Sequence, residues 1–73
     1  MAFAENLKKL RDEKGLSQAE LARMANISQP SVANFEIGKI VPTIITGVDL
    51  AKALGTTCEQ LVKGEINERT SNI

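Results

Sequence analysis

Apolar residues recur at spacings of three and four positions along most of the chain, with polar residues between them. Near the beginning, Phe3, Leu7 and Leu10 fall on one face of a helix that we expect over residues 2–14. Similar spacing returns in four later segments, each of which is short and needs tertiary packing to persist. The pattern therefore predicts an all-α domain of five short helices.

Two short helices in the middle of the chain are separated by a very tight turn. Ser17 and Glu20 are spaced as a capping box, which predicts that a helix begins there and covers residues 18–25. Ser28 is placed to cap the next helix, which we expect over residues 29–37. Two helices of about eight residues joined in this way are typical of a helix-turn-helix unit, whose second helix enters the major groove of DNA.

The turn between these helices carries its own sequence signals. Asn26 stands where the chain must reverse sharply, and asparagine tolerates the left-handed conformation better than most residues. Ile27 and Val32 flank the cap at the spacing of a hydrophobic staple. Pro30 falls in the first turn of the following helix, where its missing amide donor costs nothing.

Two further helices follow in the second half of the chain. Thr43 predicts the start of the fourth, in whose interior Gly47 costs about 1 kcal/mol relative to alanine. Thr57 and Gln60 are spaced as a second capping box, which predicts a short fifth helix closed by a glycine at position 64. Residues 65–73 are polar and lack an apolar face, so we expect them to form a loose tail.

Length and charge set limits on what the chain can be. Its 73 residues suit one domain, which we assign to residues 1–64. Hydrophobic residues make up 42% and charged residues 25%, as in an ordinary soluble globular protein. Nine basic residues balance nine acidic ones, and this neutrality weighs mildly against nucleic-acid binding. A DNA-binding function must therefore depend on where the cations lie.

Several functional classes are disfavoured by residues that the sequence lacks. It contains no histidine and a single cysteine, Cys58, which excludes an internal disulfide and a multi-cysteine zinc site. We expect no catalytic residues, no metal site and no cofactor. No apolar run approaches the roughly 20 residues of a membrane span and no signal peptide opens the chain, so we expect a cytoplasmic protein. For Cys58, a packed thiol is favoured over a redox switch.

Several motifs in the chain match one family at the correct relative spacing. The segment LKKLRDEKGLSQAELARMANIS is followed by VANFEIGK, then by a proline and LAKALG. This combination, over about residues 5–63, resembles the helix-turn-helix domain of phage repressors and Cro proteins, the xenobiotic-response-element type. The resemblance implies a compact, five-helix, lambda-repressor-like fold and a DNA-binding transcription regulator of bacterial or phage origin.

The resemblance also implies roles for individual residues. Base edges would be read by outward positions near the start of the recognition helix, namely Gln29, Pro30, Ala33 and Asn34. DNA phosphates would be held by Gln18, Ser28, Ser31, Lys39 and Arg11. Arg11 also matches one half of an ion pair with Glu36 that ties the first helix to the third, and we favour this scaffolding role over the phosphate contact. The alternative for Gln29 and Asn34 is that they are simply surface polar residues.

One group of apolar residues departs from the family pattern. Aliphatic side chains stand where the family often has polar or basic ones, at Ile37, Ile40, Val41 and Ile45. Together they could form an exposed patch, which usually marks an interface. The alternative is that some of them fill the space left by Gly47. We favour a homodimer interface, which would place two recognition helices about 34 Å apart.

Two functions from different classes remain in competition. The first is a sequence-specific repressor or autoregulator that binds a palindromic operator in double-stranded DNA as a homodimer, with regulation through concentration or a protein partner. The second is a protein-interaction module, such as an antitoxin-like or adaptor domain, that uses the aliphatic patch. Zero net charge favours the second, whereas Gln18, Gln29 and Lys39 favour the first.

Overall fold

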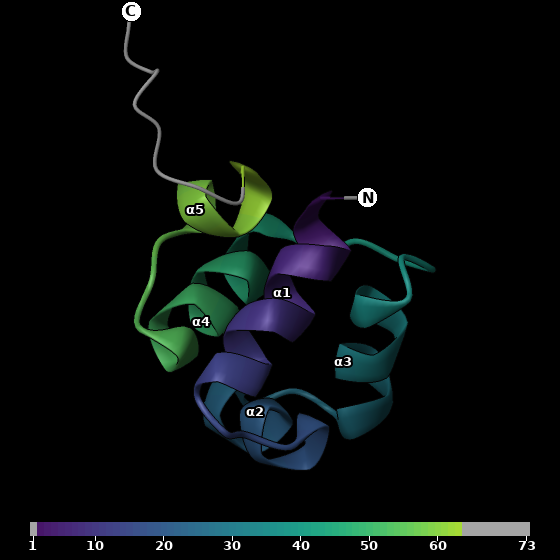
Figure 1. Cartoon of the computed structure of the whole chain (residues 1–73). Helices are drawn as coiled ribbons and strands as arrows, with labels where there is room; N and C mark the ends of the chain where they lie inside the picture. The colour runs from purple at the N-terminus through teal and green to yellow at the C-terminus, as the bar shows by residue number, and fades with distance from the viewer. Residues whose placement is uncertain (1, 64–73) are drawn as a thin grey trace, which may run out of the picture.

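Five α-helices make up residues 2–63, the part of the chain that the computed structural model describes (Figure 1). They are α1 (Ala2–Glu13), α2 (Gln18–Ala25), α3 (Gln29–Glu36), α4 (Ile44–Leu54) and α5 (Cys58–Lys63). The all-α prediction is confirmed, and α1 and α3 each end one residue earlier than the sequence pattern indicated. The expected closure at position 64 and the expected tail over 65–73 lie outside the described residues.

The helix starts form through the caps that the sequence predicts. The Ser17 hydroxyl accepts from the Glu20 amide at 3.0 Å, while the Glu20 carboxylate accepts from the Ser17 amide at 2.7 Å. This reciprocal capping box satisfies two backbone donors that a helix start otherwise leaves unpaired. Ser28 and Thr43 cap α3 and α4 in the simpler way, each accepting from the amide three residues later.

The turn between α2 and α3 is closed by a left-handed residue, as predicted. Asn26 has φ 61° and ψ 43°, and its amide donates to carbonyl groups in the last turn of α2. The next amide, that of Ile27, donates to the Ala22 carbonyl at 2.9 Å. These bonds satisfy the carbonyls at the end of α2 and turn the chain directly into α3.

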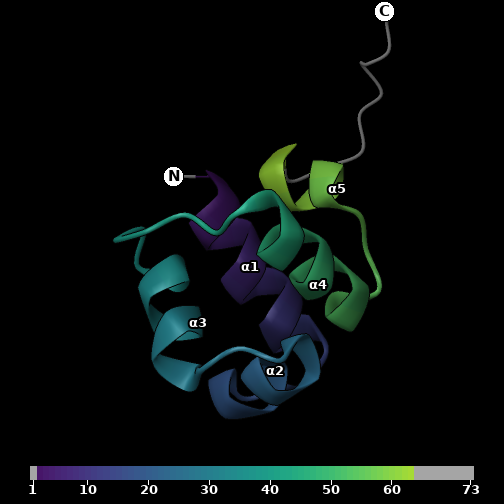
Figure 2. The ribbon, with the colours of Figure 1, turned by 180° about the vertical axis from the view of Figure 1, so that it is seen from behind.

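The core lies where α1 passes between the other helices. In both views α3 and α4 stand on opposite sides of α1, and α5 covers the end of the bundle where α1 begins (Figures 1 and 2). The buried aliphatic residues include Leu7, Leu21, Leu50 and Leu54, which are almost completely inaccessible. Phe3 and Phe35 meet edge to face, with ring centroids 6.4 Å apart. Burial of these side chains holds helices that would not persist alone.

The short helix α5 is attached to the bundle by a buried side chain and by a hydrogen bond to α1, which is distant in the sequence. Leu61 is buried in the core, and its carbonyl accepts from the Asn6 side chain of α1 at 2.8 Å. The second capping box forms only in part. The Thr57 hydroxyl accepts from the Gln60 amide as predicted, but the Gln60 side-chain oxygen accepts from the Thr56 hydroxyl, one residue before the expected partner.

Gly47 occupies a buried position in α4 that has room for a side chain. A Cβ built there would meet the Cys58 sulfur at 3.7 Å, an ordinary van der Waals distance. We expect Gly47→Ala to raise the free energy of unfolding by about 0.5–1 kcal/mol, because alanine favours the helix and restricts the unfolded chain. Urea denaturation measures this change. Gly15→Ala is the matched control, since Gly15 has φ +71° in open space and alanine there should destabilise the protein.

The capping box makes part of the stability depend on pH. The hydrogen bond from the Ser17 amide lowers the pKa of Glu20 below its usual 4.5, because it favours the charged carboxylate. The contribution of the charged Glu20 cap to the free energy of unfolding is therefore complete above about pH 4.5. It is lost as the pH falls through the lower pKa that Glu20 has in the folded protein. Glutamine can form the same cap without titrating. The difference in Tm between the parent and Glu20→Gln should shrink from pH 6 to pH 3, and a constant difference would contradict this account.

Candidate nucleic-acid interface

The predicted recognition helix α3 has a buried apolar face and an exposed first turn. Val32 and Phe35 are buried, whereas Gln29 and Pro30 at the first turn are exposed. Ala33 and Asn34 follow on the same helix and are half-buried. The four positions expected to read bases are therefore reachable from one side of the molecule, and none of them is needed in the core.

A buried ion pair connects the end of α3 to α1. The Arg11 Nε donates to Glu36 Oε2 at 2.6 Å, and a second guanidinium nitrogen donates to Glu36 Oε1 at 3.1 Å. The two side chains are 10% and 2% exposed. An ion pair with two hydrogen bonds is strong and directional, so it fixes the angle between α3 and α1.

Arg11 has little capacity left for a DNA phosphate. Its remaining terminal nitrogen donates to the Leu16 carbonyl at 2.7 Å and lies 3.3 Å from Asp12. The hydrogen bond to Glu36 raises the pKa of Arg11, although burial opposes it. Arg11 thus stays positively charged, and most of its donors are used in hydrogen bonds within the fold.

Two glutamines extend the ion pair to the start of the recognition helix. The Gln18 side-chain nitrogen donates to Glu36 at 3.0 Å, and its oxygen accepts from the Gln29 side chain at 2.9 Å. The bond uses one N–H of Gln29, whose amide also has a second N–H and an oxygen. The result is a continuous chain of four side chains from α1 to the first residue of α3. The sequence did not reveal that Gln18 shares Glu36 with Arg11.

The same contact brings two helix starts together. Gln18 and Gln29 are the first residues of α2 and α3, and their side chains are hydrogen-bonded. Each helix start carries a partial positive charge and backbone N–H groups without intrahelical partners. Two such ends at one surface favour the binding of anions such as DNA phosphates. The partial positive charges of the two helix starts give this surface an attraction for anions that the total charge of the chain, which is zero, does not provide.

The other residues expected to bind phosphate differ in how many of their polar groups already form hydrogen bonds within the fold. The Ser28 hydroxyl caps α3 and lies 2.8 Å from the Ser31 hydroxyl, so both serve the helix start. The Lys39 side chain is exposed just after α3, but its backbone amide donates to the Asn34 carbonyl at 3.0 Å. This internal bond leaves the ammonium group of Lys39 as the donor available to the phosphate that Lys39 was expected to hold.

The aliphatic patch lies on the surface. Its members Ile37, Ile40, Val41 and Ile45 are 73%, 45%, 62% and 75% exposed, so none of them fills the space beside Gly47. The structure adds three exposed aliphatic residues that the sequence did not single out, namely Ile44, Val48 and Val62. For Ile44 and Val48, spacing alone could not predict the exposure, because apolar residues lie on most sides of α4. Exposed aliphatic surface of this extent is typical of an interface.

Among residues 2–63, no cluster of three histidine, cysteine, aspartate or glutamate side chains could hold a metal ion. None of the five helices over the same range has the length and apolar character needed to cross a bilayer.

The fold and this surface define a helix-turn-helix domain of the repressor type, and the comparisons agree. The helix-turn-helix family model matches residues 7–61, so the chain belongs to the helix-turn-helix family. A similar curated protein is the uncharacterised HTH-type transcriptional regulator YqaE of Bacillus subtilis, which is 36% identical over 67 residues. The match covers 92% of this chain and 58% of YqaE. The chain spans less than three-fifths of the length of the first curated relatives it matches.

Solved structures of regulators share the fold over most of the chain. The P22 c2 repressor, in complex with a synthetic operator, superposes with a TM-score of 0.84 and 25% identity, covering 89% of this chain and 98% of that one. The restriction-modification controller protein C.AhdI from Aeromonas hydrophila has a TM-score of 0.79 and 32% identity, covering 82% and 91%. The predicted repressor-like fold is confirmed.

Proposed function

We propose that this chain is the DNA-binding part of a transcription regulator, a repressor or autoregulator that binds a palindromic operator as a homodimer. The observation that carries the proposal is the side-chain network from Arg11 through Glu36 and Gln18 to Gln29. It orients an exposed glutamine at the start of an exposed helix, beside two helix starts that attract phosphate. This arrangement supports a role of the surface in DNA binding.

Base reading is assigned to the exposed first turn of α3 and the residues that follow it. The free N–H and oxygen of the Gln29 amide match the two groups that adenine presents in the major groove. Asn34 can pair in the same way, while the Pro30 ring and the Ala33 methyl group suit a thymine methyl. The buried face of α3 stays in the protein core.

Phosphate contacts set the position of the domain on the duplex. The helix start at Gln18 and the exposed ammonium group of Lys39 supply the main contacts, with Ser28 and Ser31 contributing from the cap of α3. So few cations make a single domain a weak binder. Two domains on one duplex, with half-sites about 34 Å apart, would combine their affinities. The P22 c2 repressor, which was solved in complex with a synthetic operator, supports the binding of operator DNA by this domain.

Backbone amide NMR spectra, recorded as a random-sequence duplex is added at low salt, test the proposed surface. We expect the largest shift changes at Gln18, Gln29 and Lys39, with smaller changes in α5. Addition of salt should reverse the changes, because non-specific binding is driven by counterion release. Changes that spread evenly, or that concentrate away from α2 and α3, would contradict the proposed surface.

A protein-interaction module is the second candidate function. It is favoured by the exposed aliphatic residues of α4 and the preceding loop and by the zero net charge of the chain. This function predicts no spectral change on addition of DNA at any salt concentration. The same titration therefore decides between the two functions.

A further inference from the structure

The Glu36 carboxylate is an acceptor that Arg11 and Gln18 share. Arg11 donates to both of its oxygens, at 2.6 Å and 3.1 Å, and the Gln18 side-chain nitrogen donates to Oε1 at 3.0 Å. An ionised carboxylate has no proton to donate, so it fixes the direction of each of these bonds. The Glu36 side chain is 2% exposed, which leaves water little access to compete. Gln18 must therefore turn its nitrogen, and not its oxygen, toward Glu36.

The direction set at Glu36 is passed through Gln18 to the protein surface. With its nitrogen facing Glu36, Gln18 has its oxygen left for the Gln29 side chain, whose nitrogen donates to it at 2.9 Å. That bond uses one N–H of Gln29 and leaves the second N–H and the oxygen at the exposed start of α3. One donor and one acceptor suit adenine, which presents N7 and an amino group, whereas guanine presents two acceptors.

We propose that Glu36 is a positioning residue for base choice, whose carboxylate acts through Gln18 to orient the Gln29 amide for adenine and against guanine. The inference rests on the proposed function, in which Gln29 reads a base, and it assigns the choice of base to a side chain inside the protein. A scaffolding role alone would not have this effect. The bonds between Arg11 and Glu36 hold α3 whichever way the two glutamine amides face.

The substitution Glu36→Gln should reverse the direction of the chain. It replaces the carboxylate by an amide of the same shape with one oxygen and one nitrogen. The shortest contact, from the Arg11 Nε at 2.6 Å, requires the oxygen, so the amide nitrogen takes the place of Oε1 beside Gln18. Gln18 then turns its oxygen inward and its nitrogen toward Gln29, which accepts and presents two N–H groups outward. Two donors suit the N7 and O6 acceptors of guanine.

The base preference of the parent and of Glu36→Gln tests the inference. Bound duplexes are selected from a random pool, and the base pair read by Gln29 is the one whose preference is lost in Gln29→Ala. Fluorescence anisotropy then compares adenine and guanine at that pair in one half-site. The parent should favour adenine by about 5- to 150-fold, the range for a two-bond contact. In Glu36→Gln this ratio should fall below about one fifth of the parent value, the smallest effect of losing that contact.

Two further variants separate base choice from charge and stability. Glu13→Gln is the matched control, because it removes the same charge from an exposed glutamate at the end of α1 and should leave the ratio unchanged. Glu36→Gln is measured at a temperature where circular dichroism shows it folded. The double variant Arg11→Met, Glu36→Leu removes the acceptor without leaving a buried charge unpaired, so it should fold and should also lower the ratio.

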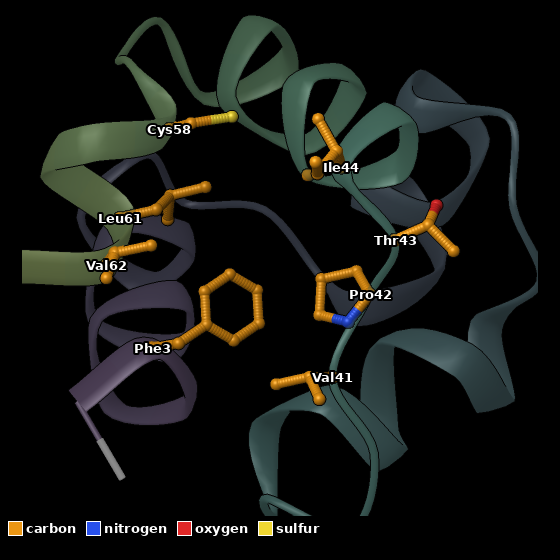
Figure 3. Close-up of a pocket in the computed structure, with 9 residues that line it drawn as sticks. Phe3, Val41, Pro42, Thr43, Ile44, Cys58, Leu61 and Val62 are labelled. Carbon is orange, nitrogen blue, oxygen red and sulfur yellow. The ribbon is translucent and has the colours of Figure 1, made fainter.

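The aliphatic surface of the domain is not altered by these substitutions. An open apolar cavity of about 400 Å³ lies beside it, bounded by the start of α1, the segment that leads into α4, and α5 (Figure 3). Its lining includes Phe3, Val41 and Val62, and none of the described residues that line it belongs to the network. A change in the ratio between two duplexes therefore reports base preference and not a change in assembly.

NMR of the free protein tests the orientation of the amides without DNA. In the parent, one side-chain N–H proton of Gln29 is bonded to the oxygen of Gln18. Its resonance should lie downfield of its position in Gln18→Ala, and Glu36→Gln should remove this difference. A difference that persists in Glu36→Gln would overturn the inference.

The binding data distinguish failure of the inference from failure of the proposed function. Equal weakening on both duplexes, with the ratio kept, would show that Glu36 only holds α3, and the proposed function would stand. A parent that prefers guanine at the base pair read by Gln29 would likewise overturn the inference alone. A parent that enriches no motif from the pool would overturn both.

Discussion

Replacing Glu36 with alanine should lower the free energy of unfolding by about 3 kcal/mol. The substitution leaves the Arg11 guanidinium, which is 10% exposed, without its main counter-charge, and removal of one partner of a buried pair costs about 3–5 kcal/mol. The expected loss is at the low end of this range, because Arg11 still donates to the Leu16 carbonyl and still lies near the Asp12 carboxylate. A domain of this size has only about 5–10 kcal/mol of stability, and Tm should fall by at least about 12 °C.

Two further variants separate the ion pair from the general effect of losing a glutamate. Glu13→Ala removes an exposed glutamate at the end of α1 and should change stability by less than about 0.5 kcal/mol. The double variant Arg11→Met, Glu36→Leu should regain most of the loss, since apolar residues of similar volume replace a buried pair well. A single variant Glu36→Ala as stable as the parent would show that the pair does not hold α3 in place.

Replacing Gln29 with alanine should weaken binding to the operator by about 1–3 kcal/mol per half-site and leave binding to random DNA unchanged. Because a homodimer carries the substitution twice, the loss on a complete operator should be at least about 30-fold. The protein should unfold at the same temperature as the parent, because Gln29 is exposed and packs against no core residue. Fluorescence anisotropy with operator and scrambled duplexes measures the difference.

The network predicts that Gln18 and Gln29 act as a coupled pair. Gln18→Ala removes the acceptor that orients Gln29, so the double variant should lose less affinity for the operator than the two single losses combined. Asn34→Ala is the matched control, since its side chain lies outside this network and its effect should add to that of Gln29→Ala. Equal weakening on operator and random DNA would show that Gln29 does not read bases.

The local structure could be predicted from the sequence because its signals are local. Ser17, Ser28 and Thr43 cap their helices through the amide three residues later, a contact that depends only on nearby backbone. The left-handed conformation of Asn26 follows equally from its own side chain and its place between two helices. At Gln60 the prediction failed in part, because an adjacent threonine hydroxyl competed for the side chain.

The candidate site was predictable only in part because it depends on how helices meet. The pair of Arg11 and Glu36 was expected from the resemblance, but the sharing of Glu36 with Gln18 requires the start of α2 to approach the end of α3. The exposure of Ile44 and Val62 depends on which face of α4 and α5 remains uncovered. The spacing of apolar residues cannot show which face is uncovered when apolar residues lie on most sides of a helix.

The most direct test of DNA binding by a homodimer is selection of bound duplexes from a random pool at two salt concentrations. The account predicts recovery of a two-fold symmetric motif with half-sites near one helical turn apart, and weaker recovery at the higher salt concentration. Enrichment of an asymmetric motif would remove the homodimer from the account. No enrichment even at low salt would contradict the central claim, and it would favour the protein-interaction function instead.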